Sequence, residues 1–159
     1  MKYSTTKYFE GCKLTTYICP AGKPTIGWGH TGADVKHGMT ITQQQADELL
    51  VKDMKIRELA VVGMVSGKVD LKEHELEALA DFAYNKGITA LKSSTLMRLL
   101  LAGKKEEAAN EFLKWNKADG THNKKDDDGD GLIDEPGEKQ TLKGLTNRGI
   151  AQRKLFLGL

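Results

Sequence analysis

The spacing of apolar residues changes once along the chain, and this change constrains the fold more than any other feature. Residues 14–19 and 24–28 are short runs with β-branched and aromatic side chains, separated by a Pro-Ala-Gly-Lys turn at 20–23. A short helix is expected before them, over 3–11, and from Thr42 onward apolar residues recur at helical spacing. The sequence therefore predicts an α+β fold, with a small N-terminal β-hairpin lobe and a larger helical lobe.

Capping signals predict where the later helices begin and end. The capping-box pattern at 42–45 begins a long helix that ends near Gly63. Asp70 is expected to cap the next helix, which Gly87 ends. Three shorter helices are expected over 93–102, 105–115 and 146–156, and the polar segment 116–142 is expected to be a surface loop.

Length and composition limit the class of protein. The 159 residues fit one domain, so 1–159 is expected to be a single unit. The content of 39% hydrophobic and 29% charged residues is typical of a soluble globular chain. No apolar run approaches the roughly 20 residues of a membrane span. The first twenty residues show no signal peptide, so a cytoplasmic location before release is expected.

Charge is spread unevenly. The chain has 24 basic and 22 acidic residues, and seven of the acids lie in 126–138, which has no Lys or Arg. The rest of the chain therefore carries 24 basic residues against 15 acids, a net charge of +9. A basic body suits an anionic polymer, either nucleic acid or bacterial cell wall, although surface lysines that only solvate the protein explain it equally well.

Two motifs match known patterns only in part. Residues 27–32 match G-x-G-x-x-G, but no amphipathic helix follows to receive a pyrophosphate. His74 and Glu75 begin H-E-x-x-H, but Ala78 stands where the second histidine is needed. Neither a dinucleotide site nor a zinc site is predicted.

Three residues around the hairpin have the chemistry for glycosidic bond cleavage. Glu10 ends the first helix, Cys19 ends the first strand, and Thr25 lies across the turn from Cys19. The hairpin should bring Cys19 and Thr25 together, opposite Glu10. An acid that faces polar groups across a cleft can protonate a leaving oxygen while water attacks from the other side. Taken alone, a glutamate at a helix end is more often an ordinary surface residue.

Eight residues separate Glu10 from Cys19, and five separate Cys19 from Thr25. This spacing resembles the signature of the phage-type lysozymes (endolysins, muramidases), in which the second of the three residues is Asp or Cys. The resemblance extends over most of the chain outside the acidic insert. It includes Phe9–Gly11, Leu14–Tyr17, Cys19–Gly22, Thr25–Gly32, Gly38–Thr42, Phe82–Gly87, Ser94–Leu96, Trp115 and Leu145–Arg148. It implies a lysozyme-like fold with the active-site cleft between the two lobes. It also implies peptidoglycan as substrate, cut between N-acetylmuramic acid and N-acetylglucosamine.

The resemblance implies that Glu10 is the general acid and that Thr25 helps to position the attacking water. Cys19 departs from the Asp form, and a thiol with an ordinary pKa of about 8.5 is mostly protonated at neutral pH. As a thiolate it could attack the anomeric carbon and give retention, or it could orient water beside Thr25 and give inversion. The third alternative is that Cys19 only packs. A disulfide with Cys12, which has no role in the signature, would mask the thiol.

Three further residues are candidates for substrate binding: His30, Asn85 and Trp115. His30 is expected to order the hairpin or to hydrogen-bond near Glu10, and a purely structural histidine is the alternative. Asn85 and Trp115 suit a sugar cleft because saccharides bond to amides and stack on aromatic rings, although core packing is the stronger alternative for Trp115. Arg148 could pair with a carboxylate of the wall peptide, or cap a helix.

The acidic insert at about 120–140 contains the start of an EF-hand-type loop, D-x-D-x-D-G, at 126–131. Position 12 of that loop is Gly137 in place of Glu, and no flanking pair of helices is evident. Two interpretations of this segment are therefore possible: it binds a structural calcium ion, or it is an acidic loop exposed to solvent. The candidate ligands are Asp126, Asp128, Asp130, Leu132 and Asp134. The expected hydrolysis needs no cofactor.

The resulting prediction is a muramidase that serves host lysis by a phage. Two rivals remain: a lytic transglycosylase, and a catalytically dead, calcium-dependent wall-binding module. By resemblance, we expect a monomer that binds peptidoglycan and does not bind nucleic acid. We also expect it to stay in the host cytoplasm until a separate holin-type protein lets it reach the periplasm and cell wall.

Overall fold

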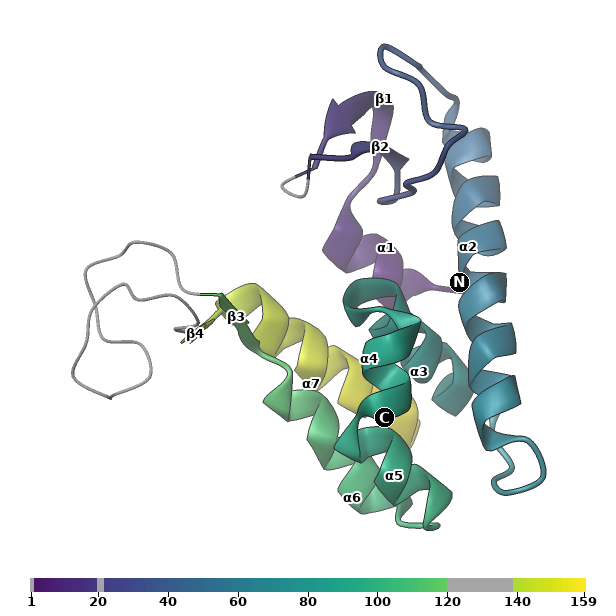
Figure 1. Ribbon diagram of the computed structural model, residues 1–159, viewed down its shortest axis with the longest axis vertical. Helices are drawn as coiled ribbons and strands as arrows, with labels where there is room; N and C mark the ends of the chain where they lie inside the picture. The colour runs from purple at the N-terminus through teal and green to yellow at the C-terminus, as the bar shows by residue number, and fades with distance from the viewer. Residues whose placement is uncertain (1, 20–21, 120–138) are drawn as a thin grey trace.

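The computed structural model describes residues 2–19, 22–119 and 139–159, and it has a hairpin lobe and a helical lobe joined by one long helix (Figure 1). The elements are α1 (Ser4–Glu10), β1 (Lys13–Ile18), β2 (Pro24–Gly27), α2 (Gln43–Val65), α3 (Glu73–Lys86), α4 (Ile88–Ser93), α5 (Thr95–Leu101), α6 (Lys105–Glu111), a 3-10 turn (Phe112–Lys114), β3 (Lys117–Asp119), β4 (Lys139–Thr141) and α7 (Lys143–Leu157). The predicted α+β architecture is confirmed.

The hairpin lobe is built on the antiparallel pair β1–β2. Tyr17 lies opposite Thr25 in the register, and a bridge between Ile26 and His30 continues the structure past β2. A small apolar cluster supports the lobe: Ile26, Val35, Ile41 and Ala46.

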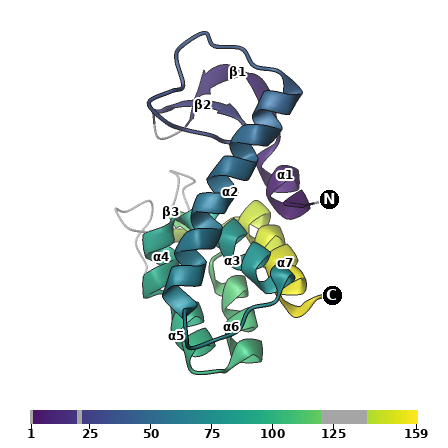
Figure 2. The same ribbon diagram turned by 90° about the vertical axis from the view of Figure 1, so that its right-hand side faces the viewer.

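Helix α2 joins the lobes because its buried residues serve three apolar clusters in succession. Ala46 belongs to the hairpin cluster, Leu50 and Met54 pack with Tyr3, and Val61 and Val65 enter the large core of the helical lobe. Figure 2 shows α2 running from one lobe into the other. Its predicted capping box is confirmed: Gln45 N donates to Thr42 Oγ1 at 3.1 Å and Thr42 N to Gln45 Oε1 at 2.8 Å.

Helix α3 is the centre of the helical lobe. It packs against α2 on one side and α7 on another, and residues Ala78 to Ala83 are all buried. The core beside it includes three phenylalanines in contact, Phe82, Phe112 and Phe156. Asp81 lies within this buried run and is its one charged residue.

Three boundary predictions differ from the structure. Asp70 does not cap α3: the helix begins at Glu73, because Glu75 reaches back to accept from Lys72 N at 2.8 Å. A separate helix, α4, precedes α5, and Ser94 caps α5 by accepting from Met97 N. The expected loop 116–142 begins and ends in a two-stranded ladder, β3–β4. No described helix is both long and apolar enough to span a membrane.

Candidate active site

Glu10 is the last residue of α1 and faces an open cleft of about 350 Å³. Gly11 ends the helix there with a φ of +66°, a conformation that glycine adopts without strain. The cleft is lined by Phe9 and Glu10 of α1, Asn85 of α3, and Leu142, Gly144, Leu145 and Arg148 around the start of α7. Three segments far apart in the sequence therefore meet at one carboxylate.

Arg148 holds the Glu10 carboxylate from the side of α7. Its Nη1 donates to Glu10 Oε1 at 2.6 Å, while Nε and Nη2 donate to the two oxygens of Asp81 at 3.1 and 2.8 Å. Burial opposes the charge of Arg148, but the bonds and charges of Asp81 and Glu10 outweigh it and raise the pKa of the guanidinium. Arg148 therefore remains a cation in this buried position.

The hairpin lobe approaches Glu10 from the other side. Gly29 has a φ of +95°, and a Cβ at this position would lie 3.2 Å from Glu10 Oε2. Tyr84 of α3 donates its hydroxyl to the carbonyl of Trp28 at 2.9 Å, which ties the hairpin lobe to the helical lobe. Burial, with the charges of Asp53 and Glu10, raises the pKa of Tyr84, so this hydroxyl stays a donor. The conformation at position 29 thus favours glycine, and any larger residue would press on the Glu10 carboxylate.

Tyr17 connects the hairpin residues with Glu10. Burial raises the pKa of the Tyr17 phenol, and electrostatic interaction with Glu10 and Cys19 raises it further. The phenol is therefore within electrostatic range of both groups, and its backbone lies opposite Thr25. That Cys19 and Thr25 face Glu10 stays a prediction from the sequence.

The hairpin turn fixes the polar atoms of Thr25 and Cys19. Thr25 is buried and its Oγ1 donates to Lys23 O at 3.0 Å, so this oxygen is left as an acceptor for any further partner. Cys19 N donates to the same carbonyl at 3.0 Å. Cys12 points elsewhere, because its Sγ accepts from Gln43 Nε2 of α2 at 3.7 Å, and the two cysteines are not joined in a disulfide.

Of the three expected substrate-binding residues, the structure brings only Asn85 into the cleft lining. His30 is buried in the hairpin lobe with its ring nitrogens 2.7 Å from Asp53 Oδ2 and 3.2 Å from Asp34 Oδ2, which fits its ordering role. Trp115 packs edge-on against Phe82, with ring centroids 5.0 Å apart, so its placement follows the core alternative.

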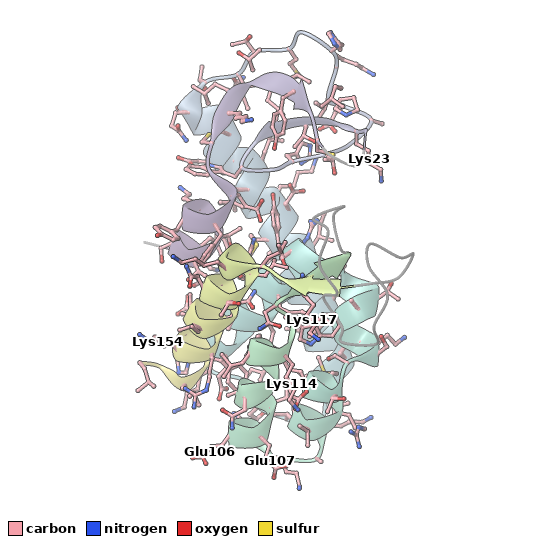
Figure 3. The ribbon with its side chains drawn as sticks, turned by 90° about the vertical axis from the view of Figure 1, so that its left-hand side faces the viewer. Lys23, Glu106, Glu107, Lys114, Lys117 and Lys154 are labelled. Carbon is pink, nitrogen blue, oxygen red and sulfur yellow. The ribbon has the colours of Figure 1, made fainter. Side chains whose placement is uncertain are left out.

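The candidate calcium ligands at 126–134 lie outside the described residues, and calcium binding stays a prediction. Within the described ranges, no group of three or more His, Cys, Asp or Glu side chains is placed to hold a metal ion. Figure 3 views the molecule from the left-hand side of Figure 1, with Lys23 marking the hairpin lobe and Lys117 marking β3.

Sequence reasoning missed Asp81 and assigned Arg148 to other roles. One signal was available for Asp81, since it is an acid in the middle of an apolar helical run, and a buried acid needs a charged or hydrogen-bonding partner. The sequence alone could not indicate that this partner is Arg148, or that the same guanidinium reaches Glu10.

Comparison with known proteins gives a consistent family. The Phage lysozyme family model matches residues 7–151. An endolysin of Bacillus phage B103 is 45% identical over 153 residues, which is 95% of this chain and 50% of that protein. The chain thus spans about half the length of that relative.

Two solved structures are also similar. The muramidase domain of SpmX from Asticaccaulis excentricus has a TM-score of 0.81 with 29% identity, and the match covers 96% of this chain and 92% of that one. An endolysin from Escherichia coli O157:H7 phage FAHEc1 has a TM-score of 0.78 with 35% identity, covering 96% and 88%. The lysozyme-like fold expected from the sequence is confirmed.

Proposed function

The chain belongs to the phage lysozyme family, and from this membership we propose that it hydrolyses the β-1,4 bond between N-acetylmuramic acid and N-acetylglucosamine in peptidoglycan. The observation that carries the proposal is the Glu10 carboxylate, which faces an open cleft and is held there by Arg148. A fixed carboxyl group in a cleft is what a general acid of a glycosidase requires.

Glu10 is the proton donor of the proposed reaction. Its Oε1 accepts from Arg148, which leaves Oε2, on the side of Gly29, to carry the proton. That proton passes to the glycosidic oxygen as the bond between this oxygen and the anomeric carbon breaks. Asn85, in the lining of the same cleft, offers amide groups for the N-acetyl or hydroxyl groups of the sugars.

Thr25 is proposed to orient the attacking water. Because its hydroxyl proton is committed to Lys23 O, Oγ1 can only accept from a water molecule. A water that donates to Thr25 directs an oxygen lone pair away from the threonine, toward a sugar held in the cleft. The side chain thus orients the nucleophile and does not remove its proton, which passes to solvent water as the oxygen bonds to the anomeric carbon.

Two roles of Cys19 are compatible with this arrangement. As a thiolate it would attack the anomeric carbon while the leaving oxygen takes the proton of Glu10. Water would then displace the sulfur, and the product would retain its configuration. Beside Thr25, Cys19 would instead help to hold the attacking water, and the product would be inverted. Nuclear magnetic resonance of freshly formed product distinguishes the two anomers. Full activity of Cys19→Ala would exclude both roles and leave catalysis to Glu10.

A digest of purified peptidoglycan tests the proposal. The intact protein should release fragments with new reducing ends and the mass of hydrolysis products, and Glu10→Gln should release almost none while keeping its melting temperature. Products lighter by one water would indicate a lytic transglycosylase. Sedimentation with the wall without any product, the same for both proteins, would indicate a wall-binding module.

The biological setting is proposed on the same basis. The family resemblance supports a monomeric enzyme that reaches the wall from the host cytoplasm at lysis, through a separate holin-type protein. Co-expression tests this: cells that make the enzyme alone should keep growing, and cells that also make a holin should lyse. Lysis by the enzyme alone would contradict the need for a separate release protein.

A further inference from the structure

The carboxylate of Asp81 is fully buried and accepts four hydrogen bonds. Oδ1 accepts from Thr6 Oγ1 at 2.7 Å and from Arg148 Nη2 at 2.8 Å. Oδ2 accepts from Arg148 Nε at 3.1 Å and from Gln152 Nε2 at 2.7 Å. Both oxygens are thus satisfied, which is the condition under which a charged carboxylate can be kept in a protein interior.

These four bonds tie together the elements that build the cleft. Thr6 lies on α1, four residues before Glu10, while Arg148 and Gln152 lie on α7. Asp81 of α3 therefore fixes α1 against α7. Two of the three nitrogens of Arg148 are engaged by Asp81 in a planar fork, so the third, Nη1, has one direction left, and Glu10 lies there.

A cation beside a general acid raises an electrostatic problem. A guanidinium at hydrogen-bond distance favours the ionised carboxylate, and an ionised Glu10 cannot donate a proton. Charges interact more strongly when one partner is buried, as Arg148 is, than they do in open water. The anion of Asp81 on the far side of the same guanidinium opposes its field, so that Glu10 faces an ion pair with no net charge.

We propose that Asp81 is a positioning residue for the proton donor: it aims the Arg148 guanidinium at Glu10 and balances its charge, so that Glu10 is held in place without being forced to ionise. The inference rests on the proposed function of Glu10. It assigns to a buried residue, which does not line the cleft, control over the pH range in which the enzyme works.

Other charged and titratable groups also face the Glu10–Arg148 pair. Tyr17 faces it from the hairpin, and Tyr84 and Lys86 face it from α3. Burial and the nearby charge of Arg148 lower the pKa of Lys86, so a second cation stands close to the first. This second positive charge increases the need for a buried anion at position 81.

Three variants test the proposal through kcat and kcat/KM on purified peptidoglycan fragments over a range of pH. Asp81→Asn keeps the shape but removes the negative charge, so the alkaline limb of the profile should move to lower pH by about one pH unit. At pH 7, kcat should fall about tenfold or more while KM stays within about twofold, since the acid and not the sugar contacts has changed.

Arg148→Gln leaves the Asp81 anion uncompensated near Glu10, so its alkaline limb should move in the opposite direction, to higher pH. The double variant Asp81→Asn, Arg148→Gln removes both charges and should return the limb to within about half a pH unit of the wild type. A merely structural role for Asp81 would lower activity in all three without opposite shifts. Should Asp81→Asn fail to fold, the comparison of Arg148→Gln with the double variant carries the test.

Glu75→Gln is the matched control, because it neutralises another buried acid of α3, one that pairs with Lys105 away from the cleft. Its pH profile should match the wild type. An unmoved alkaline limb in folded Asp81→Asn, or a double variant that behaves as Arg148→Gln, would overturn the inference. Inactive wild-type protein would instead overturn the proposed function, so the two failures are distinguishable.

Discussion

Arg148 Nη1 lies 2.6 Å from Oε1 of Glu10, although the two residues are separated by 138 positions in the sequence. The contact brings the end of α1 and the first turns of α7 together at the cleft, and Asp81 of α3 supports it from behind. The proposed proton donor is thus held by a buried ion pair and not by its own helix alone.

Replacing Arg148 with lysine should impair activity although the positive charge is kept. A lysine has one ammonium and cannot bond Asp81 and Glu10 together in the geometry of a guanidinium. We expect at least about a tenfold loss of kcat and a loss of about 1–3 kcal/mol in the free energy of unfolding. Arg153→Lys is the control, since Arg153 Nε donates to Asn110 Oδ1 on an exposed surface, away from the cleft. Wild-type turnover in Arg148→Lys would show that charge alone suffices.

Gly29→Ala should separate activity from stability. Its Cβ would meet Glu10 Oε2 at 3.2 Å and its φ of +95° is unfavourable for alanine. Gly38→Ala is a matched control, because Gly38 has a φ of +75° and open space around its Cβ position. Both variants should lose about 1–2 kcal/mol of unfolding free energy from backbone strain. Only Gly29→Ala should lose most of its turnover, and equal activities would contradict a role for the close approach.

Two glutamates on α3 should show opposite pH dependence of stability. For Glu75, burial works against ionisation, but the bonds from Lys105 and from Lys72 N outweigh it and lower its pKa below 4.5. A carboxyl group whose pKa is lowered by folding stabilises the folded state at pH values above its ordinary pKa. This stabilisation is lost as the pH falls through the lowered pKa. Glu75→Gln should therefore cost about 1 kcal/mol at pH 7 and nothing in strong acid, as chemical denaturation at several pH values can measure.

For Glu77, burial raises the pKa above 4.5 despite a bond from Tyr3 N. The contribution of Glu77 to the free energy of unfolding is therefore fully present below pH 4.5, and it is lost as the pH rises through the raised pKa. Glu77→Gln, which keeps an oxygen for Tyr3 N, should be at least as stable as the wild type at pH 7. A clear loss of stability at neutral pH in this variant would contradict the assignment.

A thiol reagent should inactivate the enzyme through Cys19. Alkylation adds bulk where the hairpin approaches the cleft, so activity should fall with time of treatment. Cys12→Ser should remain sensitive, because Cys12 Sγ faces Gln43 of α2. Cys19→Asp, the other residue of the family signature, should be active and resistant. If Cys12→Ser were resistant to the reagent instead, the inactivation would be due to Cys12, and this would contradict the prediction.

Calcium binding by the acidic insert remains a prediction from sequence. Melting curves in millimolar calcium and in excess chelator should differ by several degrees if the ion ties the insert down. Asp126→Asn, Asp128→Asn should abolish the difference without changing turnover, since no proposed step uses a metal. Identical melting temperatures in calcium and chelator would favour the solvated loop.

The local elements and the family could be predicted from the sequence. Capping at Thr42 and the β-branched runs on either side of the 20–23 turn act through neighbours in the chain, so helix α2 and the hairpin were predictable with their approximate limits. The Glu10–Cys19–Thr25 spacing indicated the proposed proton donor and its proposed partners, because all three lie within one short segment.

The tertiary structure alone decided what surrounds that segment. Trp115 packs on Phe82, and His30 faces Asp53 and Asp34; neither choice is encoded by spacing, because aromatic and imidazole rings suit a core as well as a cleft. The pairing of Asp81 with Arg148 and Glu10 requires α1, α3 and α7 to meet. Bonds between distant segments depend on how whole helices pack, and the burial that makes such an ion pair strong exists only once the helices have packed.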